Sequence, residues 1–414
     1  MSNVIIGQSG GPTAVINSSL AGAIKAAKIR GIPKVYGMHY GIEGFLNDDI
    51  IDMDDYLHDL NDLSLLKRTP AAFLGSCRYK LPDVEGNEAV YERIFSLLEK
   101  YDIEYFLYIG GNDSMDTIKK LHDYARATGK RQKFMGVPKT IDNDLPITDH
   151  CPGYGSAAKF VATSMDELIA DNESFGGGAP RICVVEIMGR NAGWLTAASV
   201  LSHNSDCTGP DLIYCPEVPL DLNNFVTRVQ DLAKAKKSVV IAVSEGLTTS
   251  DGTLVCDLNN DHEFVDAFGH KQLSGCGRVL ANLVANETGY KTRAIEFSLL
   301  QRCSTHLASR ADLDEAYNVG FIACDEALKG ESGRMVVLLV RHREPYVCDY
   351  QTVDVHEVAN LEKKLPLEWI TNDGTYVSKD FVEYASPLII GTVMPYYAAG
   401  IPKHMSVKYC KINK

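Results

Sequence analysis

A pattern that occurs twice in the first part of the chain limits what this sequence can fold into. Each time, an apolar run leads into a glycine-rich turn and a helical stretch. Residues 3–6 precede a turn at 7–13 and a helix expected over 14–29, and residues 105–109 precede a turn at 110–117. A strand, a glycine turn and a helix in this order direct backbone amides toward an anion. Each turn alone is equally consistent with a tight turn that binds nothing.

The same alternation continues along the chain. Strands alternating with helices are typical of α/β proteins with mainly parallel sheets. The chain has 414 residues, which is long enough for two domains. Apolar runs predict further strands at 134–137, 182–188, 212–214, 238–243 and 335–340, and helices are expected at 90–100 and near 193–201.

The composition argues against several classes of protein. A net charge of −13 argues against nucleic acid as a partner, and a phosphorylated ligand must be attracted by a local cluster of cations. No apolar run reaches the roughly 18 residues of a membrane span, and the first residues lack the pattern of a signal peptide. The eleven cysteines are scattered, without a Cys-x-x-Cys pair, which suits a reducing compartment. We therefore expect a cytoplasmic protein that spans no membrane.

The segment 138–144, Pro-Lys-Thr-Ile-Asp-Asn-Asp, is the strongest candidate for chemistry. Asp142 and Asp144 lie two residues apart after an apolar run, and Lys139 and Thr140 precede them. Two buried carboxylates without a partner would cost several kcal/mol, so such a pair is poor core material. Together these side chains supply a base, a metal ligand, a counter-charge for phosphate and a hydroxyl. The alternative is a turn rich in Asp and Asn that only caps the next element.

Four motifs together resemble the phosphofructokinase family over roughly residues 3–305. They are Ser9-Gly10-Gly11, the Gly-Gly-x-x-Ser turn at 110–114, the 138–144 segment and Met188-Gly189-Arg190, in this order. The resemblance implies two doubly wound, Rossmann-like domains with mainly parallel sheets. It also implies that residues 1–152, with part of the segment after 302, bind the phosphoryl donor and that 153–301 bind a sugar phosphate. Residues 345–414 form a C-terminal extension without an assigned role.

The resemblance also implies a role for each site residue. Asp142 would be the general base toward the 1-hydroxyl of fructose 6-phosphate, Thr140 would touch the transferred phosphoryl group, and Arg190 would face its charge. Arg181 and Arg293 come from a neighbouring subunit in bacterial relatives, which implies a homodimer or homotetramer. Each arginine has an alternative role in a surface ion pair. The implied donor residues are Gly11, Arg78, Gly111, Asp113 and Ser114, and the implied sugar-phosphate residues are Thr140, Asp142, Arg181, Met188, Gly189, Arg190, Glu245, Arg293 and Arg302.

Two positions indicate which phosphoryl donor is used. ATP-using bacterial members have glycine where this chain has Asp113 and Lys139. A carboxylate at 113 would occupy the place of a nucleoside α-phosphate and repel it, and Lys139 would give an ammonium group to a small, highly charged donor. Both residues resemble the pyrophosphate-dependent branch, which implies a reversible enzyme of glycolysis or gluconeogenesis. The implied cofactor is Mg²⁺, with Asn112, Asp113 and Asp144 as ligands, although Asn112 stands where the family has an aspartate.

Three alternatives to a pyrophosphate-dependent enzyme stay open at this point. An ATP-dependent 6-phosphofructokinase predicts that Asp113→Gly leaves the choice of donor unchanged. A different kinase with a glycine-rich turn, such as an NAD or lipid kinase, does not account for the 138–144 segment. A sugar-phosphate sensor on the same fold predicts binding without turnover, although the expected base, Asp142, is present.

Overall fold

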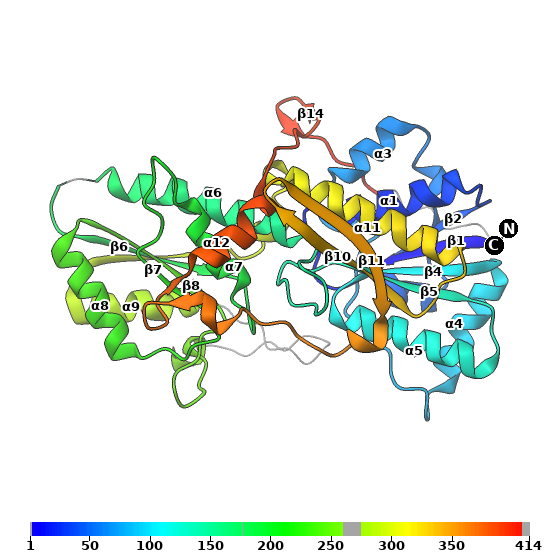
Figure 1. Ribbon diagram of the computed structural model, residues 1–414, viewed down its shortest axis with the longest axis horizontal. Helices are drawn as coiled ribbons and strands as arrows, with labels where there is room; N and C mark the ends of the chain where they lie inside the picture. The colour runs from blue at the N-terminus through cyan, green and yellow to red at the C-terminus, as the bar shows by residue number, and fades with distance from the viewer. Residues whose placement is uncertain (1, 176, 260–274, 408–414) are drawn as a thin grey trace.

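The computed structural model describes residues 2–175, 177–259 and 275–407, which form two lobes, each built on a β-sheet with helices on both faces (Figure 1). Most neighbouring strands run parallel, so the predicted α/β class is confirmed. Among the described residues, none of the helices is long and apolar enough to cross a membrane.

The sheet of the first lobe has seven strands in the order β11-β10-β5-β4-β1-β2-β3. Its neighbours are parallel except for β10 with β11 and β2 with β3. The chain leaves this sheet after β5 and returns to it only at β10, after building the second lobe. The strands are β1 (Asn3–Gln8), β2 (Val35–Met38), β3 (Ile50–Asp52), β4 (Ile103–Gly110), β5 (Lys133–Pro138), β10 (Arg334–Arg343) and β11 (Tyr346–Asp354).

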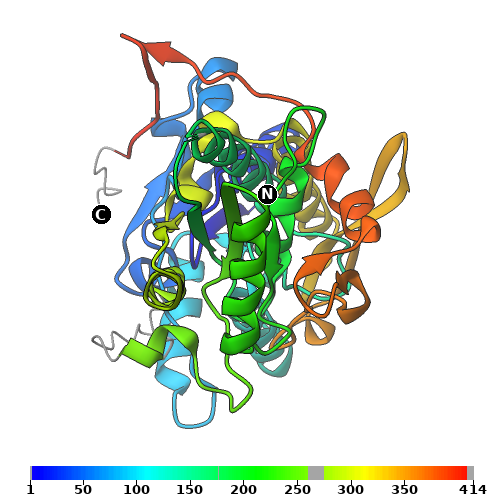
Figure 2. The same cartoon turned by 90° about the vertical axis from the view of Figure 1, so that its left-hand side faces the viewer.

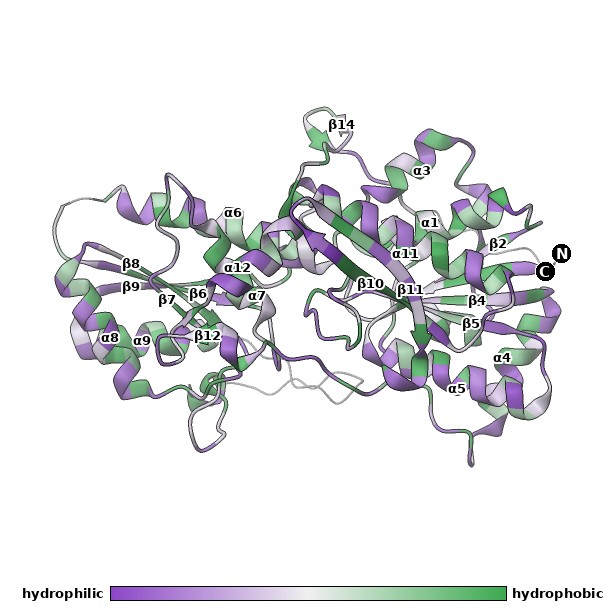
Figure 3. Cartoon of the chain, viewed as in Figure 1, coloured by the Kyte–Doolittle hydropathy of each residue, from purple (hydrophilic) through white to green (hydrophobic). Residues whose placement is uncertain are grey.

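Side-chain alternation explains why the central strands of this sheet are apolar throughout. In β1, Val4 and Ile6 pack on one face while Ile5 packs on the other, and all three are fully buried. Figure 3 shows the resulting concentration of hydrophobic residues along the central strands. The covering helices are α1 (Ile16–Ile29), α3 (Leu60–Lys67) and α11 (Arg310–Leu328) on one face and α2 (Gly41–Leu46), α4 (Glu88–Lys100) and α5 (Asn112–Thr128) on the other.

The sheet of the second lobe is entirely parallel, in the order β7-β8-β6-β9. The helix expected near 193–201 is shorter than predicted: α7 (Trp194–Ala197) ends after four residues and continues as a 3₁₀ turn. The Ser199 hydroxyl donates to the Thr196 carbonyl at 2.6 Å, which competes with α-helical pairing. The elements are β6 (Arg181–Ile187), β7 (Leu212–Tyr214), β8 (Ser238–Ser244), β9 (Lys291–Glu296), α6 (Tyr154–Glu173), α8 (Leu222–Ala235), α9 (Cys276–Thr288) and α10 (Leu300–Cys303).

The segment after β11 crosses from the first lobe to the second. Phe381 and Tyr384 in α12 (Lys379–Ala385) join the same apolar core as Val185 of β6. Figure 2 shows this part of the chain, in orange and red, along the side of the second lobe. Two short hairpins complete it, β12 (Ile370–Thr371) with β13 (Tyr376–Val377) and β14 (Tyr397–Ala398) with β15 (Ile401–Pro402).

Candidate active site

Lys139 lies between the two glycine turns, because β1, β4 and β5 all end at the same edge of the first sheet. Its backbone N–H donates to the Gly110 carbonyl at 3.0 Å, and its Nζ donates to the Gly11 carbonyl at 2.6 Å. The side chain is 3% exposed. This burial lowers the pKa of the Lys139 ammonium group to about 8, although the Asp142 carboxylate acts in the opposite direction. A buried amine therefore joins the two turns.

A close approach explains why one of the turn positions is glycine. A Cβ on Gly110 would lie 1.8 Å from Ser114 Oγ and 2.5 Å from Ser114 Cβ, so a side chain does not fit there. Asn112 and Asp113 are the first residues of α5, where backbone N–H groups have no carbonyl one turn earlier in the helix, whereas the Ser114 N–H donates to the Gly111 carbonyl at 3.1 Å. The second turn thus provides the amide-rich helix start that an anion requires.

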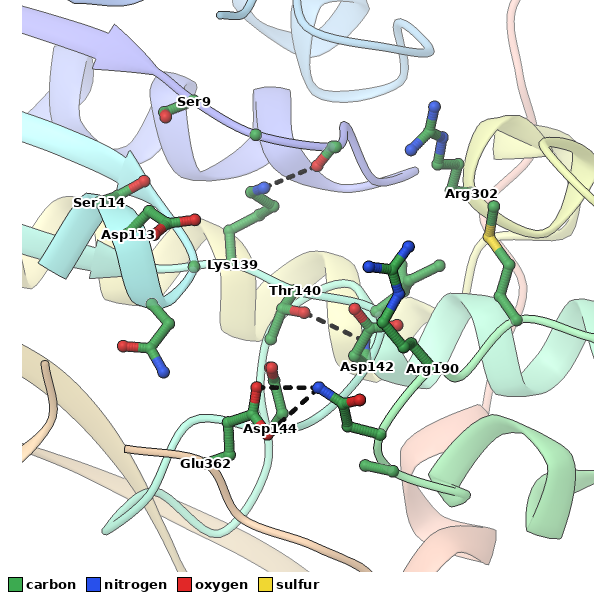
Figure 4. A pocket seen from close by; sticks show the side chains of 18 of the residues that line it. Ser9, Asp113, Ser114, Lys139, Thr140, Asp142, Asp144, Arg190, Arg302 and Glu362 are labelled. Atoms are coloured by element: carbon green, nitrogen blue, oxygen red, sulfur yellow. Dashed lines mark hydrogen bonds between the residues drawn. The ribbon is translucent and has the colours of Figure 1, made fainter. Parts of the chain in front are cut away.

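Both turns and the segment 139–144 line one cavity of about 650 Å³ (Figure 4). This volume is within the usual range for sites that bind small molecules. The first lobe contributes Ser9, Gly10, Gly11, Pro12, Arg78, Gly111, Asn112, Asp113, Ser114, Lys139, Thr140, Ile141, Asp142 and Asp144; the second contributes Met188, Arg190, Asn191, Ala192, Glu245 and Arg302; the segment after β11 contributes Asn360, Leu361 and Glu362.

The two carboxylates of the 138–144 segment face this cavity. Burial raises the pKa of Asp142, and burial together with the charge of Asp142 raises the pKa of Asp144 to about 7. The backbone N–H of Asp142 donates to Thr140 Oγ1 at 3.1 Å, which fixes the start of the turn. Asp144 Oδ1 is buried without a hydrogen-bond partner. Desolvated carboxylates in this position are suited to accept a proton or a cation.

Arginines provide the local positive charge that an anionic ligand needs in a protein of net charge −13. Arg78, Arg190 and Arg302 all line the cavity. The charges of Arg302 and Arg190 oppose the effect of burial on the pKa of Asp142, so both act on that carboxylate. Burial lowers the pKa of the Arg302 guanidinium, and the charge of Arg78 acts in the same direction.

Glu245 closes the cavity on the side of the second lobe. It follows β8, and its Oε1 accepts a hydrogen bond from the Gly189 backbone N–H at 3.3 Å. Burial raises the pKa of Glu245 to about 7. Met188 lies in the cavity wall beside it. The carboxyl ends of β6 and β8 thus place three predicted residues next to one another.

Comparison with known proteins agrees with this geometry. A family model described as phosphofructokinase matches residues 3–323. The chain belongs to the phosphofructokinase family. It is 40% identical over 403 residues to a protein of Halomonas elongata named pyrophosphate--fructose 6-phosphate 1-phosphotransferase, covering 97% of this chain and 95% of that protein.

Solved structures that are similar to this chain agree with the sequence comparison. The crystal structures of pyrophosphate-dependent phosphofructokinase from Nitrosospira multiformis and Marinobacter aquaeolei superpose with TM-scores of 0.90 and 0.88. Each is 35% identical to this chain, and each match covers 100% of this chain and 98% of the other. The predicted resemblance to this branch of the phosphofructokinase family is confirmed.

Two arginines predicted for the sugar phosphate lie outside the cavity that this phosphofructokinase chain forms. Arg181 is the first residue of β6, whose other end leads to Met188, so about seven residues at roughly 3.3 Å each separate it from the cavity wall. Its guanidinium stacks on the Phe175 ring at 3.5 Å. Arg293 is exposed, and in β9 it pairs with Cys183 of β6.

The segment after β11 supplies cavity residues that sequence reasoning missed. Asn360, Leu361 and Glu362 lie at least 170 positions from the motifs that they face, and nothing in this stretch of sequence indicates a ligand. The Asn191 side chain donates to Glu362 Oε1 at 3.2 Å (Figure 4). Asn191 directly follows the Met-Gly-Arg motif, and this position was the one feature of the sequence that could have identified Asn191 as a cavity residue.

Phosphofructokinase-family enzymes generally use a divalent metal ion, and the cavity fits one. Within the described part of the chain, no group of three His, Cys, Asp or Glu side chains could hold a metal alone. Mg²⁺ is usually bound by one or two carboxylates together with substrate phosphates, and the unpaired Asp144 Oδ1 suits this arrangement. Asn112 is less suited, because its Oδ1 accepts the Asn360 N–H at 2.5 Å and its Nδ2 donates to the Leu361 carbonyl at 2.6 Å.

Proposed function

We propose that this chain transfers a phosphoryl group from pyrophosphate to the 1-hydroxyl of fructose 6-phosphate, with Mg²⁺, in a reversible reaction. The products are fructose 1,6-bisphosphate and phosphate. One observation carries the proposal: a single cavity contains Lys139 beside a glycine turn, the desolvated Asp142 carboxylate, and Asp113 at the helix start. The names of the relatives support the same substrates for this chain. We place the activity in the cytoplasm, in glycolysis or gluconeogenesis.

The proposed transfer assigns a task to each group. The 1-hydroxyl gives its proton to Asp142 while its oxygen bonds to phosphorus, and the bond from that phosphorus to the bridging oxygen of pyrophosphate breaks. Lys139 and Arg190 balance the charge on the phosphoryl oxygens. Asp144 and Asp113 would hold Mg²⁺, with Asn112 as a weaker candidate, and the bound ion would offset the negative charge of the diphosphate. The carboxylate of Asp113 would occupy the place of a nucleoside α-phosphate and repel it.

We assign the sugar phosphate to the wall of the cavity that the second lobe forms. Glu245 and Met188 line the cavity there, Gly189 lies beside them, and Arg302 provides charge for the 6-phosphate. Arg181 and Arg293 lie outside this chain's own cavity, so they act at this site only if a second copy contributes them. We therefore propose a homodimer or homotetramer in which neighbouring subunits complete each site.

The test is a donor panel with fructose 6-phosphate: pyrophosphate, ATP, GTP and polyphosphate, each with and without Mg²⁺. We expect turnover with pyrophosphate and Mg²⁺ and at least about 10²-fold less with the other donors. Asp142→Asn should lower kcat by about 10²–10⁴-fold, because it removes the general base. Efficient use of ATP with no use of pyrophosphate would overturn the donor assignment, and near-normal turnover of Asp142→Asn would overturn the role of the base.

A further inference from the structure

The residue between the two cavity carboxylates is held from outside the catalytic segment. Asn143 is fully buried and has a φ of 56°, in the left-handed region that Asn tolerates better than most residues. Its Oδ1 accepts the Cys151 backbone N–H at 2.9 Å, which closes the loop on itself. Its Nδ2 donates to the Tyr384 hydroxyl at 2.8 Å. Both ends of this amide are thus fixed, and one of them depends on α12.

Tyr384 connects two parts of the same loop. Besides accepting from Asn143, its hydroxyl donates to the Asp149 carbonyl at 2.8 Å. Its ring lies in an aromatic cluster, with centroids 5.3 Å from those of Trp194 and of Trp369. The ring is therefore kept in place by packing that does not involve the hydroxyl. Removing the hydroxyl alone would leave the Asn143 amide buried and without its acceptor.

Lys363 holds the other side of the loop. Its backbone N–H donates to the Asp144 carbonyl at 2.7 Å, and its Nζ donates to the carbonyls of Thr148 and Asp149 at 3.1 Å and 2.8 Å. The Trp194 indole in turn donates to the Lys363 carbonyl at 3.2 Å. Lys363 is therefore hydrogen-bonded both to the loop 142–150, which carries the two carboxylates, and to Trp194 of the second lobe.

Asn112 anchors the chain just before Lys363. Its amide bonds to the backbone of Asn360 and Leu361, and the Asn360 side chain donates to Asp116 Oδ1 at 3.0 Å. The residue that departs from the family's aspartate thus fastens the C-terminal segment to the start of α5. A carboxylate in its place would face the Leu361 carbonyl without a hydrogen to donate.

We propose that Tyr384 and Lys363 are positioning residues that hold Asp142 and Asp144 in place for phosphoryl transfer. This inference rests on the proposed function and adds to it a role for residues that no cavity motif contains. The loop between 142 and 150 has left-handed backbone at Asn143 and at Ile147 and no regular secondary structure of its own, so its shape depends on these outside bonds. Small displacements of a catalytic group lower the rate strongly, by about 10²-fold for 1 Å.

The test compares Tyr384→Phe and Lys363→Met with Tyr350→Phe as the matched control. Tyr350 is also partly buried, and its hydroxyl accepts a hydrogen bond from the side chain of Asn318 in α11, outside the loop, at 3.0 Å. We expect kcat to fall about 10–100-fold in the first two variants, with both KM values changed less than about threefold. Hydrogen exchange should become faster in peptides covering 142–151 and stay unchanged in β4. Tyr350→Phe should change neither quantity.

Each outcome decides the proposal. A wild-type kcat with wild-type exchange in both variants overturns it, and so does faster exchange spread evenly over the sheets, which would indicate a loss of global stability. If the wild-type protein shows no turnover with pyrophosphate and fructose 6-phosphate, the proposed function fails. Hydrogen exchange can still be measured in that case, and wild-type exchange over 142–151 in both variants overturns the inference. Faster exchange confined to the loop, with a lower kcat, supports it even if one of the two variants does not fold.

Discussion

The ammonium group of Lys139 gives the sharpest test of how the cavity handles a diphosphate. The Lys139 ammonium group has three N–H bonds. One of them donates to the Gly11 carbonyl at 2.6 Å, and two remain for the oxygens of pyrophosphate. Two unit charges about 4 Å apart attract by about 4 kcal/mol at an effective dielectric constant near 20, which is roughly a factor of 10³ in rate. Lys139→Met keeps the side chain up to the position of Cε and removes the charged amine. We expect it to lower kcat/KM for pyrophosphate about 10³-fold.

The assay varies pyrophosphate at saturating fructose 6-phosphate between about pH 6 and pH 9.5. Because the pKa of Lys139 is lowered to about 8, its charge is lost as the pH rises through 8, and wild-type kcat/KM for pyrophosphate should fall there. Lys139→Arg keeps its charge over this range, so this fall should disappear. A Lys139→Met enzyme within about tenfold of wild type would refute the reasoning. An unchanged pH profile in Lys139→Arg would do so as well.

Three further predictions concern the donor, the metal and stability. Asp113→Gly, ideally combined with Lys139→Gly, should open some use of ATP and weaken use of pyrophosphate in the donor panel. Chelation of divalent metal should abolish turnover, and Mg²⁺ should restore it; full activity in excess chelator would contradict the assignment of Asp144. Burial acts to lower the pKa of His150, but the carboxylates of Glu315 and Asp149 at 2.7 Å and 3.0 Å raise it to about 9. The stability that comes from this raised pKa is complete below about pH 6.5 and is lost as pH rises through 9. Urea titration should therefore show the free energy of unfolding falling by roughly 3 kcal/mol over this pH range, and His150→Gln should lack this dependence.

The strands were predictable because strands buried on both faces leave a continuous apolar run in the sequence. The run at 105–109 lies inside β4 (Ile103–Gly110), and the run at 134–137 lies inside β5 (Lys133–Pro138). Turns that end such strands in a parallel sheet meet at one edge, so the convergence of the glycine turns on Lys139 followed from topology. Local sequence carries this kind of information well.

The remaining part of the site depends on contacts between residues far apart in the chain. Glu362 and Tyr384 lie in stretches without a motif. Packing of α12 against the second lobe brings Tyr384 to the loop 142–150, and the bonds of Asn112 to residues 360 and 361 hold the chain next to Glu362. The amide of Asn112 could not be assigned from sequence, because its partners are the backbone groups of residues 360 and 361. Almost every residue type has the backbone groups that such a side chain bonds to, so the sequence at 360 and 361 gives no sign of the contact.

The order of strands in the first sheet has a consequence for synthesis of the protein. β10 pairs with β5, and β11 pairs with β10, only after the sheet of the second lobe has been made, so a growing chain of about 300 residues lacks two strands of its seven-stranded sheet. Domains usually fold as units while the chain emerges from the ribosome. Here the sheet that begins first is completed after the sheet of the second lobe, and until β10 (Arg334–Arg343) is translated the open side of β5 is a strand edge that chaperones or a neighbouring nascent chain can reach.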